Sequence, residues 1–468
     1  MFIPAIKNTL QGALSVAILM VSSAGFVQAA DEKRNVILII GDGMDDQQIT
    51  IARNYLKGAR GKLLLDAMAL RSTSHILTVE DTTALRPVYV ADSANSATSM
   101  ATGQITSKGR IATSAGEDKD FVTIVELAKA AGFSTGIVSS ASVTDATPAS
   151  FISHVISRNC ENPTRMSASG DNPSWANAEL CKADRVDNGG AGSIAQQIAL
   201  GSTDVVLGGG MKHFQLRGAG SDKTLLTMAQ DSGYQLVTNA AELMSNKSSG
   251  KLLGLFSEHT MPTRLRGENG RIAERPLPSL LNSISSDLGS VELPEPMRCE
   301  KNPGYASMTS IKQMTDAAIT HLSAKEGKGF FLMVESASID KASHQRNPCG
   351  SIGELAQLEE ALASAQEFAA DHPNTLILVT ADHGQAAQLI PNPKAGLSVY
   401  TPGLIARITT PEGQIMAVNY ATSESFYEEH TGANVPLFAN TEGRGRVASM
   451  VTQPEIFNIM SAYLGLMP

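Results

Sequence analysis

The sequence predicts an α/β protein in which a central, mostly parallel β-sheet is covered by helices on both faces, with a small inserted, crown-like subdomain. Two observations support this fold class. Short runs rich in apolar residues alternate with longer stretches of helical character, which is the pattern of repeated strand–helix units. The 468 residues are 42% hydrophobic and 18% charged, which is ordinary for a soluble globular protein with a large core.

The predicted elements follow one another in order along the chain. The strands are short runs of the kind that is buried on both faces of a sheet: Asn35–Ile40, Ser134–Ser139, Asp204–Leu207, Phe330–Val334 and Thr375–Thr380. The helices carry apolar or small residues at helical spacing: Asp45–Leu56, Ala94–Ala101, Phe121–Ala131, Met308–Ala324 and Gly353–Ala370. Each of the last two helices leads into a strand, as a parallel sheet requires.

Three less regular stretches interrupt this alternation. Residues 167–187 and 257–300 are rich in Ser, Asn, Pro and charge, and we expect them to be surface excursions. Residues 390–429 contain four prolines and are expected to form the inserted loop or small β subdomain. Because no stretch has the composition of a linker, residues 31–468 are predicted to form a single domain with insertions.

The first 30 residues have the composition of a targeting segment. Met1–Ala30 contains one charged residue, Lys7, and then the apolar run Ala13–Val21. This pattern predicts a signal peptide that is cleaved after Ala29 or Ala30. The alternative is a membrane anchor, but the apolar run is short for a span of about 20 residues. We therefore expect an exported protein, periplasmic or secreted, without a stable membrane anchor after cleavage.

Charge and cysteine content narrow the possible partners and the compartment. The formal net charge is −9 and no long basic run occurs, which argues against a nucleic-acid partner. The chain has four cysteines, Cys160, Cys181, Cys299 and Cys349, and an even number in an exported chain predicts two disulfides. Sequential pairing is the simplest of the three possible pairings. A cysteine-rich zinc site is the alternative, but the chain has no Cys-x-x-Cys pair.

Carboxylates and histidines follow three of the predicted strands. In chain order they are Asp42; Glu335, Asp340 and His344; and Asp382 with His383. Taken singly, each has a structural interpretation, such as a turn, a helix cap or a surface ion pair. Together they would meet at the carboxyl ends of parallel strands, where so many buried carboxylates would repel one another without cations. The Asp and His side chains suit Zn²⁺, and the oxygen ligands suit Mg²⁺.

A candidate nucleophile begins the predicted helix Ala94–Ala101. The dipeptide Asp92-Ser93 precedes this helix, and a serine in such a position is usually only an N-cap. However, a helix N-terminus also stabilises an anion, so the position equally favours an alkoxide or a phosphoserine. A serine beside a metal ion needs no histidine base, because the metal lowers the pKa of its hydroxyl.

At this point a resemblance to a known family becomes specific. The segments GDGM, DSANSAT, DATPASFISHVISR, VESASIDKASH, NPCG, TADHG and EHTG occur in this order, and LGGG at Leu207–Gly210 is a further match. This ordered set resembles the bacterial alkaline phosphatases from about Asn35 to His430. The resemblance implies two zinc ions and one magnesium ion per chain, and a homodimer with a crown-like insertion at about 390–429.

The resemblance also implies roles for single residues. Ser93 would be the nucleophile that becomes phosphorylated, Arg158 would bind the phosphate through two hydrogen bonds, and Asp92 would orient Arg158. Asp340, His344 and His430 would hold the zinc ion that binds the leaving-group oxygen and later activates water. Asp42, Asp382 and His383 would hold the zinc ion that activates Ser93, with Asp42 also facing the magnesium ion. Thr147, Glu335 and, through water, Asp145 would bind magnesium, and Lys341 would reach the phosphate through water or pair with Asp145. The alternative for Arg158 is an ordinary salt bridge near Cys160.

These roles predict a metal-dependent phosphomonoesterase that accepts a broad range of small phosphate monoesters. Two alternatives remain open at this stage. One is a phosphodiesterase or sulfatase of the same superfamily, which would share the metal ligands. The other is an exported protein that binds metal or phosphate without turnover, although a complete set of nucleophile, metal ligands and arginine argues against it.

Overall fold

The computed structural model describes residues 1, 33–167, 175–285, 287–392 and 403–466. The signal peptide predicted at residues 1–30 therefore lies outside the described residues, except for Met1. Lys33–Pro468 form one compact unit, and the fold described below is that of this unit. None of the helices in the described ranges is both long enough and apolar enough to span a membrane.

The main sheet confirms the predicted fold class. Ten strands of the described chain form it, in the order β19 (Met450–Thr452), β2 (Leu70–His75), β18 (Val435–Ala439), β14 (Thr375–Ala381), β1 (Arg34–Gly41), β13 (Gly329–Ser336), β5 (Ser134–Ser142), β6 (Val205–Gly209), β8 (Lys251–Leu255) and β7 (Tyr234–Val237). From β14 to β7 all neighbours are parallel, whereas β18 is antiparallel to both β14 and β2.

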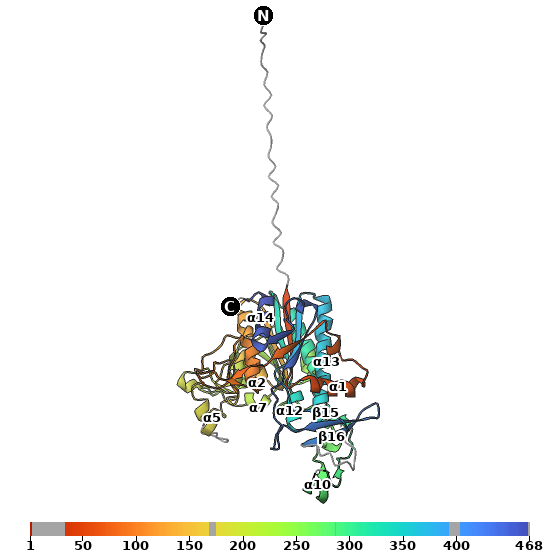
Figure 1. Cartoon of the computed structure of the whole chain (residues 1–468). Helices are drawn as coiled ribbons and strands as arrows, with labels where there is room; N and C mark the ends of the chain where they lie inside the picture. The colour runs from red at the N-terminus through yellow and green to blue at the C-terminus, as the bar shows by residue number, and fades with distance from the viewer. Residues whose placement is uncertain (2–32, 168–174, 286, 393–402, 467–468) are drawn as a thin grey trace. The chain divides into compact units, whose positions relative to one another are not determined.

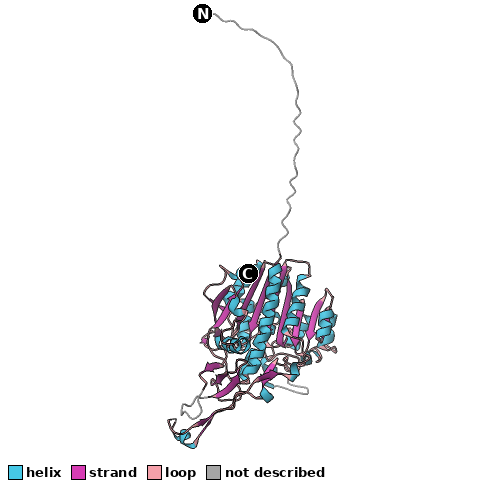
Figure 2. Ribbon diagram, turned by 90° about the vertical axis from the view of Figure 1, so that its right-hand side faces the viewer, coloured by secondary structure: helices cyan, strands magenta, loops and turns pink. Residues whose placement is uncertain are grey.

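Helices cover both faces of this sheet, as predicted. One layer consists of α1 (Asp46–Lys57), α11 (Ile311–Ser323) and α13 (Pro348–Asp371); the other consists of α2 (Ser93–Thr102), α3 (Ile124–Ala130), α4 (Ala146–Ile152) and α14 (Gln453–Leu464). In β1, Ile37 and Ile39 pack in the first core, while Val36, Leu38 and Ile40 pack in the second. Figure 1 shows α1 and α13 on one side of the strands and α2 and α14 on the other, and in Figure 2 long helices run alongside the strands.

Among the helix starts that differ from the prediction, two have clear local reasons. The helix expected at Gly353 begins five residues earlier, at Pro348, where the missing N–H of proline is tolerated and the Asn347 side chain accepts a hydrogen bond from Gly350 N. The helix expected at Phe121 begins at Ile124, because Thr123 forms a capping box with Glu126. Both corrections come from capping, which overrides the apolar spacing.

Residues 257–300 and the segment around 390–420 form one structure rather than two separate excursions. The segment at 388–420 makes a small sheet of β15 (Gln388–Ile390), β17 (Ile415–Tyr420) and β16 (Leu404–Thr409). Backbone bridges join β16 to the other segment, from Ile405 to Glu274 and from Ile408 to Met297. Residues 393–402, which belong to the predicted insertion, lie outside the described part.

The shorter elements surround these two sheets. They are β3 (Thr78–Val79), β4 (Pro87–Val88), α5 (Trp175–Leu180), α6 (Ile194–Leu200), α7 (Met211–Phe214), α8 (Leu225–Asp231), α9 (Ala240–Ser245), β9 (Leu265–Gly267), β10 (Leu277–Pro278), α10 (Leu280–Ile284), β11 (Val291–Glu292) and β12 (Cys299–Lys301). β9 pairs with β12, and β10 pairs with β11.

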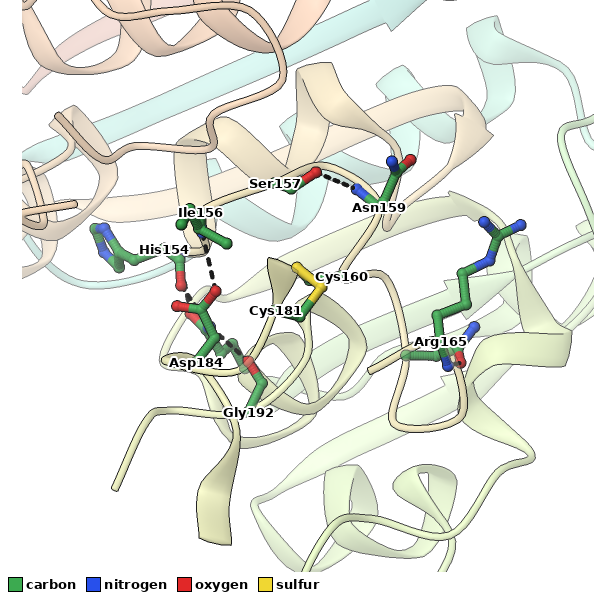
Figure 3. The surroundings of a disulfide bond; sticks show 11 residues. His154, Ile156, Ser157, Asn159, Cys160, Arg165, Cys181, Asp184 and Gly192 are labelled. Atoms are coloured by element: carbon green, nitrogen blue, oxygen red, sulfur yellow. Dashed lines mark hydrogen bonds between the residues drawn. A yellow bond between two sulfur atoms is a disulfide. The ribbon is translucent and has the colours of Figure 1, made fainter. Parts of the chain in front are cut away.

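The four cysteines form two disulfides in the sequential pairing, which confirms the simplest of the three alternatives. Cys160 is bonded to Cys181, and Cys299 is bonded to Cys349. Figure 3 shows the first disulfide and the backbone that leads to it, where the Ser157 hydroxyl accepts a hydrogen bond from Asn159 N. Because Cys160 comes two residues after Arg158, this disulfide restrains the segment that carries the arginine.

Candidate metal centre and active site

The strand register brings the predicted ligands to one edge of the sheet. Gly41, the last residue of β1, is in register with Ser336 of β13 on one side and with Ala381 of β14 on the other. Three adjacent parallel strands therefore bring Asp42 and Asp382 to the same level, with Glu335, the partner of Ile40, two residues below them. This is the edge at which open α/β sheets bind ligands.

The zinc ligands predicted at Asp42, Asp382 and His383 form a compact, buried group. Ligand atoms of Asp42, Asp382 and His383 all lie within 4.8 Å of one another. His383 Nε2 is 3.4 Å from Asp42 Oδ1 and 3.4 Å from Asp382 Oδ2. Gly43 allows the backbone after Asp42 to pass close to Gln385, because its φ is +69° and a Cβ there would lie 2.8 Å from the Gln385 side chain.

The other predicted zinc ligands, Asp340, His344 and His430, lie together beside this group. His344 Nε2 lies 3.3 Å from Asp340 Oδ1, and His430 Nε2 lies 3.4 Å from the same oxygen. The two histidines face each other, with 3.0 Å between their Nε2 atoms. His383 also comes within reach of Asp340 and His430, so the two sets are contiguous. Although His430 is far from Asp340 and His344 in the sequence, its chain segment returns to the same sheet edge.

The three histidines share an orientation that suits metal binding. Each places Nδ1 against a backbone carbonyl oxygen: His344 at Glu428, His383 at Gly384 and His430 at Ala91. Because a carbonyl oxygen only accepts, Nδ1 carries the hydrogen and Nε2 keeps its lone pair. The three lone pairs point into the acidic cluster, which is the usual arrangement of metal-binding histidines.

The predicted magnesium set lies close to Asp42. Glu335 is buried, and Ser139 of β5 donates a hydrogen bond to its carboxylate. Burial, together with the nearby Asp145, raises the pKa of Glu335 to about 8 despite that hydrogen bond. Thr147 lies close to Glu335, and its buried hydroxyl has no hydrogen-bond partner of ordinary geometry among the described residues.

Two cations surround Asp145 at the start of α4. Lys341 Nζ is 2.6 Å from Asp145 Oδ2, and Arg158 Nη2 is 2.9 Å from Asp145 Oδ1. Burial raises the pKa of Asp145, but the two cations outweigh it and hold this pKa well below its ordinary value. Arg158 Nη1 is 3.3 Å from Asp92 Oδ2, so the guanidinium is oriented by carboxylates at both ends. Lys341 therefore pairs with Asp145, which is one of the two arrangements expected for it.

Ser93 lies between these groups at the first position of α2. Asp92 caps the helix, accepting a hydrogen bond from Asn95 N, while Asn95 Oδ1 accepts one from Asp92 N. The buried Ser93 Oγ is 3.2 Å from His383 Nε2 and 3.4 Å from Asp42 Oδ1. Its hydroxyl thus faces the zinc ligands predicted at Asp42, Asp382 and His383, and it lies at the N-terminus of a ten-residue helix.

The cluster has the properties of a cation site. Burial, and then the charges of Asp382, Asp340 and Glu335, raise the pKa of Asp42 well above its ordinary value. Asp382 Oδ1 accepts hydrogen bonds from Gly43 N and His383 N, but its buried Oδ2 has no hydrogen-bond partner among the described residues. A buried carboxylate oxygen without a donor is costly, and a metal ion would stabilise it. The residues present therefore fit bound divalent cations.

Comparison with known proteins identifies the family of this chain. Residues 33–427 match the sequence profile of the family described as alkaline phosphatase. The chain belongs to the alkaline phosphatase family. It is 41% identical over 442 residues to the alkaline phosphatase of Escherichia coli (strain K12), which covers 92% of this chain and 86% of the relative.

Two further comparisons give the same family and the same fold. Streptomycin-6-phosphate phosphatase of Streptomyces griseus is 36% identical over 471 residues, covering 97% of this chain and 96% of the relative. The solved structure of alkaline phosphatase from the Antarctic bacterium TAB5 matches the fold with a TM-score of 0.63 at 22% identity, covering 94% of this chain and 99% of that one. The protein is a metal-dependent alkaline phosphatase, an enzyme that hydrolyses phosphate monoesters. Neither a diesterase or sulfatase nor a binding protein without turnover is favoured.

Sequence reasoning missed several residues that hold the candidate site in place. Gln385 Nε2 donates a hydrogen bond to Asp340 Oδ1, and Gln453 Nε2 donates one to the Asp382 carbonyl at 2.6 Å. Gln385 directly follows TADHG, so its position near the motif was the available signal. Gln453 and Glu428, whose carbonyl oxygen accepts a hydrogen bond from His344 Nδ1, had no such signal, because only the fold brings them to the site.

A cavity opens beside the cationic part of the site. It has a volume of about 280 Å³, and Asp145 and Arg158 are among its lining residues. A larger cavity of about 570 Å³ lies between α9 and α11 and contains none of the predicted site residues. The smaller cavity is therefore the one that gives access to the arginine predicted to bind phosphate.

Proposed function

We propose that this alkaline phosphatase hydrolyses a broad range of small phosphate monoesters through a phosphoserine at Ser93, releasing inorganic phosphate and an alcohol. One observation carries the proposal: the buried Ser93 Oγ lies 3.2 Å from His383 Nε2 and 3.4 Å from Asp42 Oδ1 at the start of α2. A hydroxyl in this position meets both a group of metal ligands and the positive end of a helix, and either would favour its ionised form.

The proposed cofactors are two Zn²⁺ ions and one Mg²⁺ ion per chain. The ligands would be Asp340, His344 and His430 for one zinc ion, Asp42, Asp382 and His383 for the other, and Thr147 with Glu335 and, through water, Asp145 for magnesium. When bound, these ions would lower the pKa of the attacking hydroxyl and stabilise negative charge on the phosphate and leaving-group oxygens. The carbonyl-anchored histidines and the free Asp382 Oδ2 support this assignment.

The phosphate would be bound chiefly by Arg158. Its two Nη atoms form a planar pair of donors, which matches two oxygens of a phosphate. Asp92 orients the guanidinium from the N-cap position of α2. Lys341, paired with Asp145, adds positive charge at the same place and would reach the phosphate through water.

Two displacements at phosphorus complete the proposed reaction. In the first, Ser93 Oγ attacks phosphorus in line with the ester oxygen, the ester P–O bond breaks, and the alcohol leaves with a proton. In the second, a water oxygen attacks the phosphoserine, the bond from phosphorus to Ser93 Oγ breaks, and inorganic phosphate is released with the serine hydroxyl restored.

Trapping the intermediate tests this proposal directly. Enzyme incubated with a ³²P-labelled monoester and quenched in acid is expected to carry label on Ser93, located by fragmentation of the phosphopeptide. Ser96, a buried serine of the same helix, is the internal control and should stay unlabelled. Turnover without label, or label at another residue, would remove Ser93 from the mechanism. An aryl diester and an aryl sulfate, assayed alongside, are expected to react far more slowly than the monoester.

The role of Arg158 leads to a separate prediction. Arg158→Ala is expected to raise the inhibition constant of inorganic phosphate by about tenfold or more, because hydrogen bonds to a charged group contribute about 1.5–3 kcal/mol. Arg165→Ala is the matched control, since Arg165 is half exposed and pairs only loosely with Glu161, at 3.4 Å. Equal inhibition constants for the wild type and Arg158→Ala would show that the arginine only forms a structural salt bridge.

Three further proposals concern the form in which the enzyme works. Residues 1–30 are proposed to be a signal peptide, so that residues 31–468 form a single exported domain, periplasmic or secreted, with a crown-like insertion at about 390–429. Both disulfides support export, because such bonds persist in oxidising compartments. The enzyme is proposed to be a homodimer with no stable membrane anchor and no nucleic-acid partner.

A further inference from the structure

A row of five rings leads from the buried metal ligands to the surface. The rings of His383 and His430 stack with 3.7 Å between centroids, and His430 lies 4.9 Å from His344. His344 meets Tyr427 edge to face at 6.4 Å, and Tyr427 meets Phe426 in the same way at 4.8 Å. Exposure rises along the row, from none at His383 to 56% at Tyr427 and 83% at Phe426.

The two outer rings are unusual for this protein. Among the phenylalanines and tyrosines whose burial the structure describes, only Tyr89, Phe426 and Tyr427 are exposed. All three lie on the two segments that carry the candidate site residues Ser93 and His430. These segments touch, because His430 Nδ1 contacts the Ala91 carbonyl oxygen at 2.9 Å. Exposed aromatic side chains on the segments that carry site residues indicate ligand contact rather than core packing.

The loop that carries Phe426 and Tyr427 is held in place by hydrogen bonds that do not involve the side chains of these two residues. Arg346 Nε donates to the fully buried Glu428 carboxylate at 2.6 Å, and its Nη atoms donate to the carbonyl oxygens of Ser423, Ser425 and Phe426. The same carboxylate accepts hydrogen bonds from Thr422 N, Thr422 Oγ1 and Ser423 N. Backbone and Glu428 contacts therefore fix the loop, and the two rings are free to contact something else.

We propose that Phe426 and Tyr427 form an aromatic platform for the alcohol part of the substrate, and that it favours monoesters of planar, aromatic alcohols such as phenols, naphthols and nucleosides. This inference rests on the proposed function and on the role expected for the zinc ion of Asp340, His344 and His430, which is to bind the leaving-group oxygen. The carbon side of the ester then lies over His344, and Tyr427 is the next ring outward. The enzyme accepts many monoesters, and the platform raises its affinity for those with an aromatic alcohol part.

The expected size of the preference follows from ring–ring contact. An offset or edge-to-face aromatic pair contributes a factor of about 2 to 12 in affinity beyond simple burial. A methyl or glyceryl group is too small to cover either ring, so a small alkyl ester gains almost nothing from the platform. The signature of the platform is therefore a ratio between two ligands that share the phosphoryl group and differ only in the organic part.

Two phosphonates that resist hydrolysis measure this ratio. Phenylphosphonate and methylphosphonate are tested as competitive inhibitors of glycerol phosphate hydrolysis by the metal-loaded wild type, Phe426→Ala, Tyr427→Ala and the double variant. We expect the double variant to lose about fivefold or more of the preference for phenylphosphonate, while its inhibition constant for methylphosphonate stays within about twofold. Tyr427→Phe keeps the ring and is expected to keep the preference. Leu280→Ala, an exposed residue of α10, is the surface control.

Three outcomes would overturn the platform. An unchanged ratio in the double variant would show that the rings do not touch the ligand. Equal weakening of both phosphonates would show that the rings only support His344 and His430. A change of molecular mass in light scattering, without a change of the ratio, would assign the rings to contact with a second copy of the chain. Failure of the wild type to hydrolyse glycerol phosphate would instead count against the proposed function itself.

Discussion

Ser93→Ala is expected to lower kcat by at least about a thousandfold while leaving the fold intact, because the substitution removes the proposed nucleophile. The only hydrogen-bond partners of Ser93 Oγ among the described residues are Asp42 and His383, and alanine is a favourable residue in the first turn of α2. The melting temperature should therefore change by no more than about 2 °C. Steady-state kinetics on an aryl phosphate and a thermal unfolding curve measure both effects.

The control for this substitution lies one helical turn further along α2. Ser96 is also buried, and its hydroxyl has no hydrogen-bond partner among the described residues, so it makes no hydrogen bond to a predicted metal ligand. Ser96→Ala should keep kcat within about twofold of the wild type. Activity of Ser93→Ala close to the wild-type level would mean that another group, or water, attacks phosphorus first.

Removing the metal ions is the second change with a large expected effect. Chelation should abolish monoester hydrolysis, and Zn²⁺ together with Mg²⁺ should restore it, because the candidate site places four buried carboxyl groups at one sheet edge. These groups are Asp42, Glu335, Asp340 and Asp382. Activity that survives complete chelation, with metal content verified by elemental analysis, would contradict the metal-dependent mechanism.

The metal-free enzyme is also expected to lose stability as the pH rises from about 6 to 8. The pKa of Glu335 is raised to about 8 and that of Asp42 is raised as well, so in this window the folded state binds protons that the unfolded state has released. Stability falls with pH wherever the folded state binds more protons. His344 and His430 act in the same direction, because Asp340 raises their pKa despite burial.

One histidine opposes this trend without reversing it. Burial lowers the pKa of His383, which favours folding as the pH rises through about 6.5. We expect the melting temperature of the metal-free enzyme to drop by about 5 °C or more between pH 6 and pH 8. With Zn²⁺ and Mg²⁺ bound the drop should be much smaller, since the cations compensate the carboxylates. A melting temperature of the metal-free form that rises over this range would refute the pKa assignment.

The central strands and their chemistry were predictable because both are local properties of the chain. β1, β13 and β14 are apolar runs whose length and composition suit a strand buried on both faces. Asp42, Glu335 and Asp382 lie at or just after the ends of those runs, and parallel strands in register must bring such residues to one edge. Adjacency in the sequence was therefore enough to predict that they meet.

Several elements were not predictable, because their stability comes from partners that are distant in the sequence. β18, β2 and β19 are short, with three to six residues each, and become strands only by pairing beyond β14. β5 extends through Ser142, three residues beyond its predicted end, because neighbouring strands bury its polar end. Periodicity cannot identify a strand of three residues, or a polar strand end that is buried.

By itself the sequence determined which chemical groups the protein has, and which of them lie next to strand ends or helix starts, since covalent neighbours stay neighbours in any fold. Only the tertiary structure decided how the side chains of those groups are oriented. The carbonyl oxygens of Ala91, Gly384 and Glu428 set the histidine tautomers. The Arg346–Glu428 pair holds the loop that places Tyr427 beside His344 and Phe426 against Tyr427. Orientation depends on packing between distant segments, which no local pattern records.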